Sequence, residues 1–263
     1  MRTNKPILYP SLFNRLYSVW YRHFRIYTKN LVSNGLPPFL EPLIFLAGMG
    51  LGLSKFLVEM DHLPYIQFLA TGLLVTTAMF TAAFECSFGT FIRMEFDKVY
   101  DGMLAAPINV RNLLIGEILW AGTKGFFFTF AVLCMLTLFG ILPLNGSTLL
   151  SPFVGFLTGV MFASISLLIT SFVKDINQFN FYFSGFLSPM FFFSGVVFPI
   201  GNLPPVLRPV AEIFPLTHTV RLVRAVCFFK FNYSLLLDFL FILVITLIVA
   251  YFAIQRLGRK LVT

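Results

Sequence analysis

The chain has 263 residues, of which 58% are hydrophobic and 11% are charged, and this composition excludes an ordinary soluble globular protein. Its formal net charge is +8. Because the basic residues gather beside apolar segments, this charge indicates membrane topology and anionic lipid, and not nucleic acid. The three cysteines, Cys86, Cys134 and Cys227, have no paired spacing that predicts a disulfide or a metal site.

Residues 11–30 are expected to form an amphipathic helix. Apolar and basic residues each recur at intervals of three or four, which places them on opposite helical faces. Such a helix suits the cytosolic membrane interface, where its basic face would meet anionic phospholipid. The alternative is a surface helix packed on the protein itself. His23 lies on the apolar face and is expected to be a packed aromatic side chain, not a ligand.

Six continuous apolar segments predict six membrane-spanning helices, because about 20 mostly apolar residues are needed to cross the hydrocarbon core. They cover residues 36–57, 65–92, 112–141, 149–173, 178–198 and 234–255. Continuous hydrophobicity disfavours a β-barrel, whose strands alternate. The expected fold is an all-α polytopic membrane protein that forms one domain over residues 1–263.

The distribution of lysine and arginine predicts that both termini face the cytosol. Basic residues concentrate on the cytosolic side of membrane proteins. They occur before the first span and after the last, at Arg2, Lys5, Arg15, Arg22, Arg25, Lys29, Arg256, Arg259 and Lys260.

The first span contains Gly48, Gly50 and Gly52, and small residues at this spacing predict close packing of two helices. Glu41 lies near the cytosolic end of the same span, where a charged side chain costs little.

Residues 93–109 interrupt the apolar pattern after the second span. One predicted helical face is apolar, with Phe96, Val99, Tyr100, Met103 and Leu104, and the other carries the charged Asp97, Lys98 and Asp101. Pro107 ends this helix, and Asn109 can cap the next one. A face with charges of both signs favours a soluble protein partner. The alternative is an ordinary connecting helix packed against lipid headgroups.

Three ionisable residues lie within the second and third spans: Glu85, Glu117 and Lys124. Lys124 falls about twelve residues into its span, near the middle of the bilayer at 1.5 Å per residue. A lone ammonium there costs at least about 3 kcal/mol, so we expect a partner for it. Glu85 is the first choice; direct contact with a transported substrate is the alternative. Glu117 is expected near the interface.

Residues 199–230 combine prolines with apolar residues and predict two short helices that enter the outer leaflet and return. Backbone of this kind is tolerated at membrane depth when protein or a wet cavity surrounds it. The residues singled out in this extracellular segment are Phe198, Pro199, Pro204, Pro215, His218, Arg221 and Arg224. The two arginines are expected near outer headgroups or an exit mouth, and simple snorkelling is the alternative.

The chain contains no Gly-x-x-x-x-Gly-Lys-Ser/Thr loop for binding nucleotide phosphates, and no pattern of catalytic or metal-ligating residues. We therefore assign it no catalytic residue, no metal and no cofactor of its own.

The order of motifs resembles the permease of ABC type-2 exporters, and most closely the NodJ branch that exports lipochitooligosaccharides. The matching stretches include Glu41-Pro-Leu-Ile-Phe45, Phe84-Glu85, Arg93-Met94-Glu95, Gly116-Glu117-Ile-Leu-Trp120-Ala-Gly-Thr-Lys124, Ser194-Gly-Val-Val-Phe-Pro199, Phe214-Pro-Leu-Thr-His218 and Leu222-Val-Arg224. They extend over nearly the whole chain.

This resemblance implies a location in the inner membrane of a bacterium. It also implies a homodimer whose subunits each dock a separate ATPase subunit, on which ATP and Mg bind. It also implies that residues 93–109 form the coupling helix, with contacts from Arg93, Glu95, Phe96, Tyr100, Asp101, Met103, Leu104 and Pro107. The expected substrate is an amphipathic glycolipid, lipooligosaccharide or polysaccharide that moves outward. The alternatives are an exporter of a drug or antibiotic, and a membrane scaffold or lipid-modifying enzyme.

Overall fold

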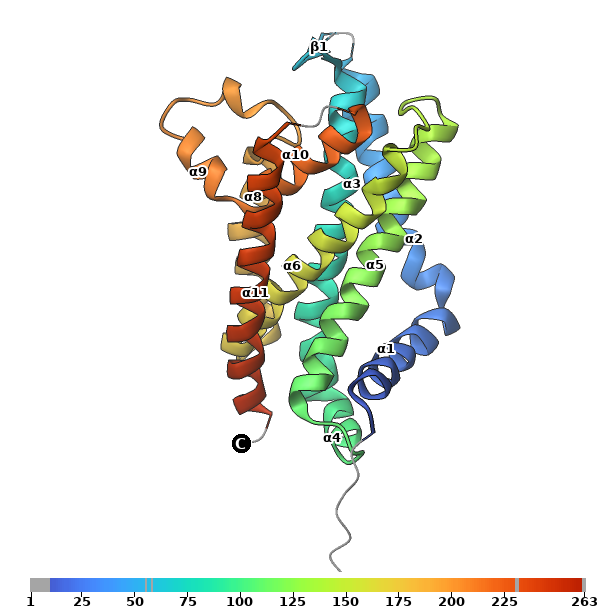
Figure 1. Cartoon of the computed structure of the whole chain (residues 1–263), viewed down its shortest axis with the longest axis vertical. Coiled ribbons are helices and arrows are strands. Elements are labelled where there is room, and N and C mark those ends of the chain that lie inside the picture. Colours follow the sequence, from blue (N-terminus) through green and yellow to red (C-terminus); the bar gives the residue numbers. More distant parts are fainter. Residues whose placement is uncertain (1–9, 55, 58, 230–231, 262–263) are drawn as a thin grey trace, which may run out of the picture.

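A computed structural model describes residues 10–54, 56–57, 59–229 and 232–261, and most of these residues are helical (Figure 1). Arg2 and Lys5, which contribute to the topology prediction, lie outside the described residues. So does Lys230, the last residue of the predicted re-entrant segment.

Five of the six predicted spans correspond to helices that are long and apolar enough to cross a membrane. The first, α2 (Leu31–Phe45), continues through a π-helical turn at Leu46–Leu51. The second, α3 (Tyr65–Phe84), continues through two further π-helical turns to Phe96. The others are α5 (Val110–Leu138), α6 (Ser151–Phe172, preceded by a 3-10 turn at Thr148–Leu150) and α11 (Ser234–Lys260).

The predicted fifth span is shorter than expected. A 3-10 turn at Ile176–Gln178 leads into α7 (Phe179–Tyr182), a π-helical turn at Phe183–Leu187 and α8 (Ser188–Phe193). The helix ends because Gly195 adopts a φ of +79°, which turns the chain away. Its crossing of the membrane therefore remains a prediction.

The two ends of the helical bundle carry different elements (Figure 1). At one end lie α1 (Leu12–Lys29), α4 (Val99–Leu104) and the end of α11. The opposite end carries α9 (Arg208–Ile213), α10 (Pro215–Phe228) and an antiparallel hairpin, in which β1 (Glu59–Met60) pairs with β2 (Leu63–Pro64). A 3-10 turn at Ile200–Asn202 precedes α9.

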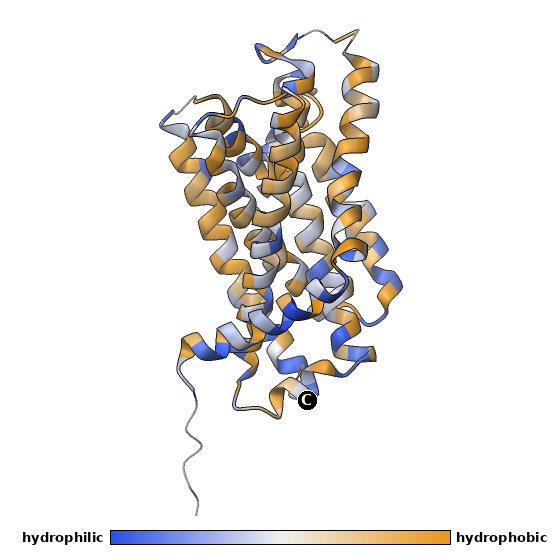
Figure 2. Ribbon diagram, turned by 90° about the vertical axis from the view of Figure 1, so that its right-hand side faces the viewer, coloured by the Kyte–Doolittle hydropathy of each residue, from blue (hydrophilic) through white to orange (hydrophobic). Residues whose placement is uncertain are grey.

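The centre of the bundle is α3, which is buried on nearly all sides by α5, α6 and α10. By contrast, α2 and α11 expose most of their apolar side chains, as lipid-facing helices do. Close contact between α5 and α6 requires glycine, because a Cβ on Gly125 would lie 2.7 Å from the carbonyl oxygen of Gly155. Figure 2 shows the dominance of hydrophobic residues along the long helices.

The prediction of one continuous helix over residues 93–107 is wrong. Arg93 belongs to the end of the second-span helix, and the chain breaks at Lys98, whose φ is +50°. The next helix, α4, has six residues. Tyr100 on α4 is buried, whereas Phe96 before the break is 63% exposed, so these two residues do not share one face. The predicted cap is confirmed: Asn109 Oδ1 accepts a hydrogen bond from the amide of Asn112 at the start of α5.

The glycines of the first span pack closely at one position. A Cβ on Gly50 would lie 3.3 Å from Ile66, but one on Gly48 or Gly52 would meet no described atom within 4 Å. The predicted close approach of two helices is therefore limited to Gly50 within this chain.

Candidate functional site

A group of polar side chains is buried where four elements meet, at the end of the bundle that carries α1 and α4. Its members, which we call the buried cluster, are His23, Glu85, Arg93, Tyr100, Glu117 and Lys124. They come from α1, the second-span helix, α4 and α5. The cluster thus joins the short helix α4 to two helices of spanning length.

Glu117 is fully buried at the centre of the cluster. Its Oε2 accepts a hydrogen bond from Arg93 Nη2 at 2.7 Å, and its Oε1 accepts one from the Tyr100 hydroxyl at 2.8 Å. His23 Nε2 lies 2.9 Å from the same Oε1. These donors favour the ionised carboxylate. From the sequence, Glu117 is expected near the membrane interface, and its place at the centre of a buried polar cluster is not predicted.

Glu85 binds two cationic side chains and is the predicted partner of one of them, Lys124. The Lys124 ammonium donates to Glu85 Oε2 at 2.8 Å, and Arg93 Nη1 donates to Oε1 at the same distance. Lys124 also lies 4.7 Å from the centre of the Tyr27 ring. The predicted Glu85–Lys124 pair is therefore present, and Arg93 links it to Glu117.

The π-helical turns of the second span explain how Glu85 and Arg93 meet. In a regular α-helix, residues eight apart lie about 80° apart around the axis. The wider turns at Glu85–Gly89 and Ile92–Phe96 rotate the chain less per residue and bring Arg93 back over Glu85. Such turns occur often at functional sites.

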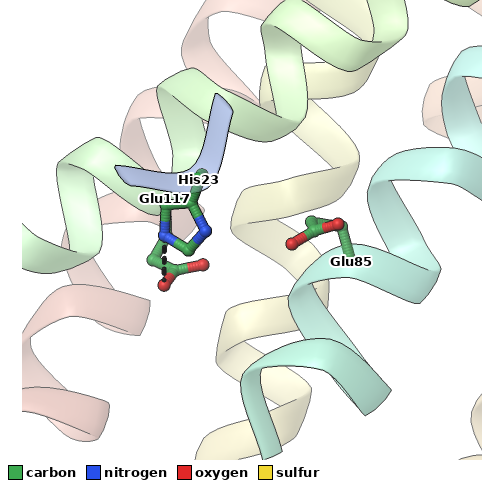
Figure 3. A group of neighbouring side chains, drawn as sticks. All are labelled: His23, Glu85 and Glu117. Carbon is green, nitrogen blue, oxygen red and sulfur yellow. Dashed lines mark ion pairs between the residues drawn. The ribbon is translucent and has the colours of Figure 1, made fainter. Parts of the chain in front are cut away.

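The charges of the cluster balance without a metal. His23, Glu85 and Glu117 offer ligand atoms within 4.8 Å of one another (Figure 3). Arg93 and Lys124 already neutralise both carboxylates, so a divalent cation would have to displace them. The geometry favours an ion-pair network over a metal centre.

Helix α1 is fixed to α5 beside the cluster. Trp20 Nε1 donates to Thr123 Oγ1 at 3.0 Å, and the His23 ring stacks on Trp120 with ring centres 6.0 Å apart. Val19 is buried against Gly116. One face of α1 therefore packs on the protein itself, as the alternative for this helix stated, while Arg25 and Lys29 remain exposed on the other face.

The other predicted coupling residues divide between the surface and the bundle. Asp101 and Pro107 are exposed, while Met103 and Leu104 are partly buried against the core. Glu95 Oε1 lies 3.3 Å from Lys260 Nζ, which connects this region to the end of α11.

A cavity of about 590 Å³ opens beside the cluster and contains Lys124. Its lining comes from α2, α3, α5 and α8, and it combines Glu41 and threonines with phenylalanines. We call it the inner cavity. Because Lys124 belongs to both, the inner cavity adjoins the buried cluster directly.

A second cavity, of about 780 Å³, lies near the hairpin and α10 and is called the outer cavity. Four of the predicted extracellular residues gather around it: Pro199, Arg221 and Arg224 line it, and His218 binds Asp238 of its wall. Phe198 is half-buried beside Pro199. Pro204 is exposed and Pro215 is buried at the start of α10, and neither lines the cavity.

Several residues of these sites were missed by sequence reasoning. His23 and Tyr100 were interpreted as apolar-face residues, because periodicity does not reveal that their polar atoms meet Glu117. Asp238 lies four residues after the start of α11 and was also missed. A lone acid inside a predicted span is itself a signal of function or pairing.

Comparison with known proteins agrees with this architecture. A family model described as ABC-2 type transporter matches residues 14–228. The chain is 31% identical to Nodulation protein J of Rhizobium leguminosarum bv. trifolii over 80% of this chain and 79% of that protein. It is 30% identical to Nodulation protein J of Rhizobium meliloti, with the same coverage, and 28% identical to that of Sinorhizobium fredii over 79% of each chain. The chain therefore belongs to the ABC-2 type transporter family, as a membrane-spanning permease subunit.

Proposed function

We propose that this permease moves an amphipathic glycolipid, lipooligosaccharide or polysaccharide-type substrate outward from the cytosol or the inner leaflet. Two copies form a homodimer, and a separate ATPase subunit, also in two copies, binds ATP and Mg. The chain crosses the membrane six times, with residues 179–193 as the fifth crossing, and both termini face the cytosol. In this topology α9 and α10 form the outer re-entrant pair.

The observation that carries the proposal is the connection from α4 to the inner cavity through the buried cluster. Tyr100 on α4 donates to Glu117, Arg93 bridges Glu117 to Glu85, and Glu85 holds Lys124 at the cavity. Each link is a hydrogen bond with an ionised partner, which is stronger and more directional than a neutral one. A displacement of α4 therefore changes the position of a charge in the inner cavity.

The exposed residues around α4 form the docking surface for the ATPase in this proposal. They combine an aromatic ring with charges of both signs and include Phe96, Asp97, Lys98, Asp101 and Pro107. Met103 and Leu104 contact the core and hold α4 on the bundle. The exposed bases of α1 meet anionic phospholipid beside this surface.

The lining of the inner cavity suits an amphipathic substrate. Lys124, Glu41 and Thr81 provide polar contacts, while Phe80 and Phe191 provide an apolar wall. The cavity is bordered by α2 and α8, whose exposed apolar faces we assign to the homodimer interface. An exporter of drugs would have the same architecture. Transport assays with glycolipids and with drugs therefore distinguish the two functions.

Copurification tests the docking surface. Asp101→Lys reverses an exposed charge on α4, and we expect it to abolish copurification of the permease with its ATPase subunit. Glu59→Lys makes the same charge change on the hairpin at the opposite end and should leave copurification intact. Equal ATPase recovery with both variants, at equal expression, would contradict this docking site.

A further inference from the structure

His218 lies in a polar group that the buried cluster does not include. It is 8% exposed on α10, and its Nδ1 lies 2.6 Å from Oδ1 of Asp238 on α11. Its Nε2 lies 3.0 Å from the carbonyl oxygen of Glu212, the residue before the end of α9. The imidazole ring packs on Phe241, with ring centres 3.8 Å apart. One side chain thus contacts α9 and α11 at once.

Both nitrogens of His218 face oxygen atoms that accept hydrogen bonds. A backbone carbonyl has no hydrogen to donate, and an ionised carboxylate is also an acceptor. Arg221 Nη1, 3.5 Å from the same Asp238 oxygen, favours the ionised carboxylate. A neutral imidazole has one N–H and can satisfy one of these acceptors, whereas an imidazolium has two. The imidazolium form therefore satisfies both acceptors.

The other side of α10 is held by a cation that stays protonated. Arg224 donates to Thr71 Oγ1 and the carbonyl oxygen of Phe68 on α3, and to the carbonyl oxygen of Gly195. Burial lowers the pKa of Arg224 to about 9, which is still above the range in which an ordinary histidine titrates. Helix α10 is therefore fixed to α3 by an arginine and to α11 by a histidine.

The charged groups that face His218 are few. Asp238 comes from α11, Glu212 from α9 and Arg221 from α10 itself; Arg221 also forms an ion pair with the Glu212 carboxylate. Three further elements pack against α10: α3, α6 and the 3-10 turn at Thr148–Leu150, which contains no ionisable side chain. Between Tyr65 and Phe84, α3 contains no Asp, Glu, Lys, Arg or His, and neither does α6. Tyr65 is the titratable side chain of α3.

We propose that His218 is a positioning residue whose imidazolium holds α9 and α10 against α11, and whose deprotonation loosens this side of the outer cavity. Arg221 and Asp238 line that cavity, so the loss of one His218 hydrogen bond moves part of its wall. Arg224 keeps the opposite side in place. In the topology proposed above, the proton is exchanged with the outer medium, and external pH then sets the opening of the mouth.

Nitrogen-15 NMR of histidine-labelled protein in lipid nanodiscs tests the protonation state directly. His62 is exposed on the hairpin and provides an internal control in the same sample; His62→Gln and His218→Gln assign the signals. At about pH 8, above the ordinary pKa of an imidazole, we expect two N–H groups on His218, and the His62 signals in the same sample serve as the reference. Asp238→Asn should return His218 to one N–H, because an amide can donate to Nδ1. A single N–H on His218 in the unmodified protein would overturn the proposal.

A distance measurement tests the mechanical consequence. Spin labels at Val210→Cys on α9 and Leu237→Cys on α11 occupy exposed positions, and Cys134→Ser removes the exposed native thiol. The distance distribution should broaden at the pH at which His218 loses its second N–H. With His218→Phe, which keeps an aromatic ring on Phe241, it should be broad at every pH. A distribution that is unchanged through that pH in the protein with His218 contradicts the proposal, whether or not the His218→Phe variant folds.

Neither measurement uses the ATPase or a substrate. A negative result here therefore leaves the permease assignment intact, and failure of ATPase copurification leaves the protonation of His218 open to the same test.

Discussion

The Glu117 carboxylate lies within reach of three polar side chains, those of Arg93, Tyr100 and His23. The Glu117→Gln variant keeps the volume of the side chain but removes its negative charge and one of its two acceptor oxygens. The remaining oxygen cannot serve both Arg93 and Tyr100, and Arg93 is left with one carboxylate partner. Breaking a buried ion pair by removing one partner costs about 3–5 kcal/mol. We expect a loss of this size in the free energy of unfolding in detergent micelles. Glu41→Gln, at an exposed position, is the control and should change the free energy little.

Tyr100→Phe separates coupling from stability. The variant loses one hydrogen bond to a charged acceptor, which contributes about 1.5–3 kcal/mol, and should still fold. With the ATPase bound, we expect ATP hydrolysis to continue while export falls several-fold. Tyr251→Phe, on the exposed face of α11, is the matched control. An unchanged ratio of export to ATP hydrolysis in Tyr100→Phe would show that this hydroxyl does not transmit the movement.

We also expect deprotonation of Tyr100 to lower the stability of the protein at high pH. Burial and the neighbouring Glu117 carboxylate raise the pKa of Tyr100 well above its ordinary value of about 10. Burial, and secondarily Glu85, raises the pKa of Tyr27 to about 12. The folded chain binds these protons more tightly than the unfolded chain, so the contribution of these two tyrosines to the free energy of unfolding is constant below about pH 10 and falls above it. Unfolding measured from about pH 8 to about pH 11 should show this decline, and Tyr100→Phe should reduce its slope.

The sequence predicted the Glu85–Lys124 pair because two opposite charges in neighbouring spans have few other partners. It could not reveal that Arg93 completes the pair. The residue was assigned to a separate coupling helix, whereas the π-helical turns extend the span and fold Arg93 back into the bundle. Wider turns of this kind leave no clear trace in hydrophobic periodicity.

At the scale of elements, the contact between α1 and α5 depends on Gly116. A Cβ at this position would lie 2.5 Å from Val19 Cγ1, so Gly116→Ala should displace α1. The chain has two tryptophans, Trp20 and Trp120, and both lie in this contact with ring centres 6.1 Å apart. Their fluorescence should therefore shift in Gly116→Ala.

Two further variants make this prediction specific. Gly102→Ala adds the same methyl group to α4, where no described atom lies within 4 Å, and should leave the fluorescence unchanged. Val19→Gly combined with Gly116→Ala removes both the Cγ1 and the Cβ of Val19, which lie 2.5 and 2.7 Å from the added methyl group, and should recover the original spectrum. If the double variant behaves like Gly116→Ala alone, the displacement has another cause.

The boundaries of helices could be predicted where a local side-chain contact determines them. Asn109 caps α5 as predicted, because a side-chain acceptor at a helix start satisfies a free amide. The break at Lys98 was missed, because a non-glycine residue in the left-handed region has no strong signature in sequence. Tertiary contacts of Tyr100 and Val99 on one side and Glu95 on the other hold this break in place.

For the whole molecule, the proposed topology places α4 and the hairpin on opposite sides of the membrane. In a background with Cys134→Ser, a thiol reagent that cannot cross membranes should label Glu59→Cys in cells whose inner membrane is intact. Asp101→Cys should be labelled after that membrane is opened. Both positions are exposed in the structure, so burial does not explain a difference. Labelling of Asp101→Cys in intact cells would reverse the assigned orientation.

Apolar segments of spanning length were enough to predict the architecture of the bundle, because the bilayer imposes both length and composition. The fifth segment shows the limit of this reasoning. Its composition is that of a span, yet Gly195 turns the chain after Phe193 and the helix is shorter than the segment. The positions of the cavities also depend on side chains from several helices, which no single segment encodes.

The arrangement of charges in the buried cluster has a consequence for how the protein is made. The second-span helix carries Glu85 and Arg93, and α5 carries Glu117 and Lys124, so each helix brings one acid and one base of its own. A single charged residue at the centre of a span opposes insertion by about 2.5–3.5 kcal/mol. Because Arg93 already neutralises Glu85 within its own helix, this helix can leave the translocation machinery before α5 has been synthesised. The later arrival of Glu117 and Lys124 then completes the cluster and locks the two helices together as a hairpin during biogenesis.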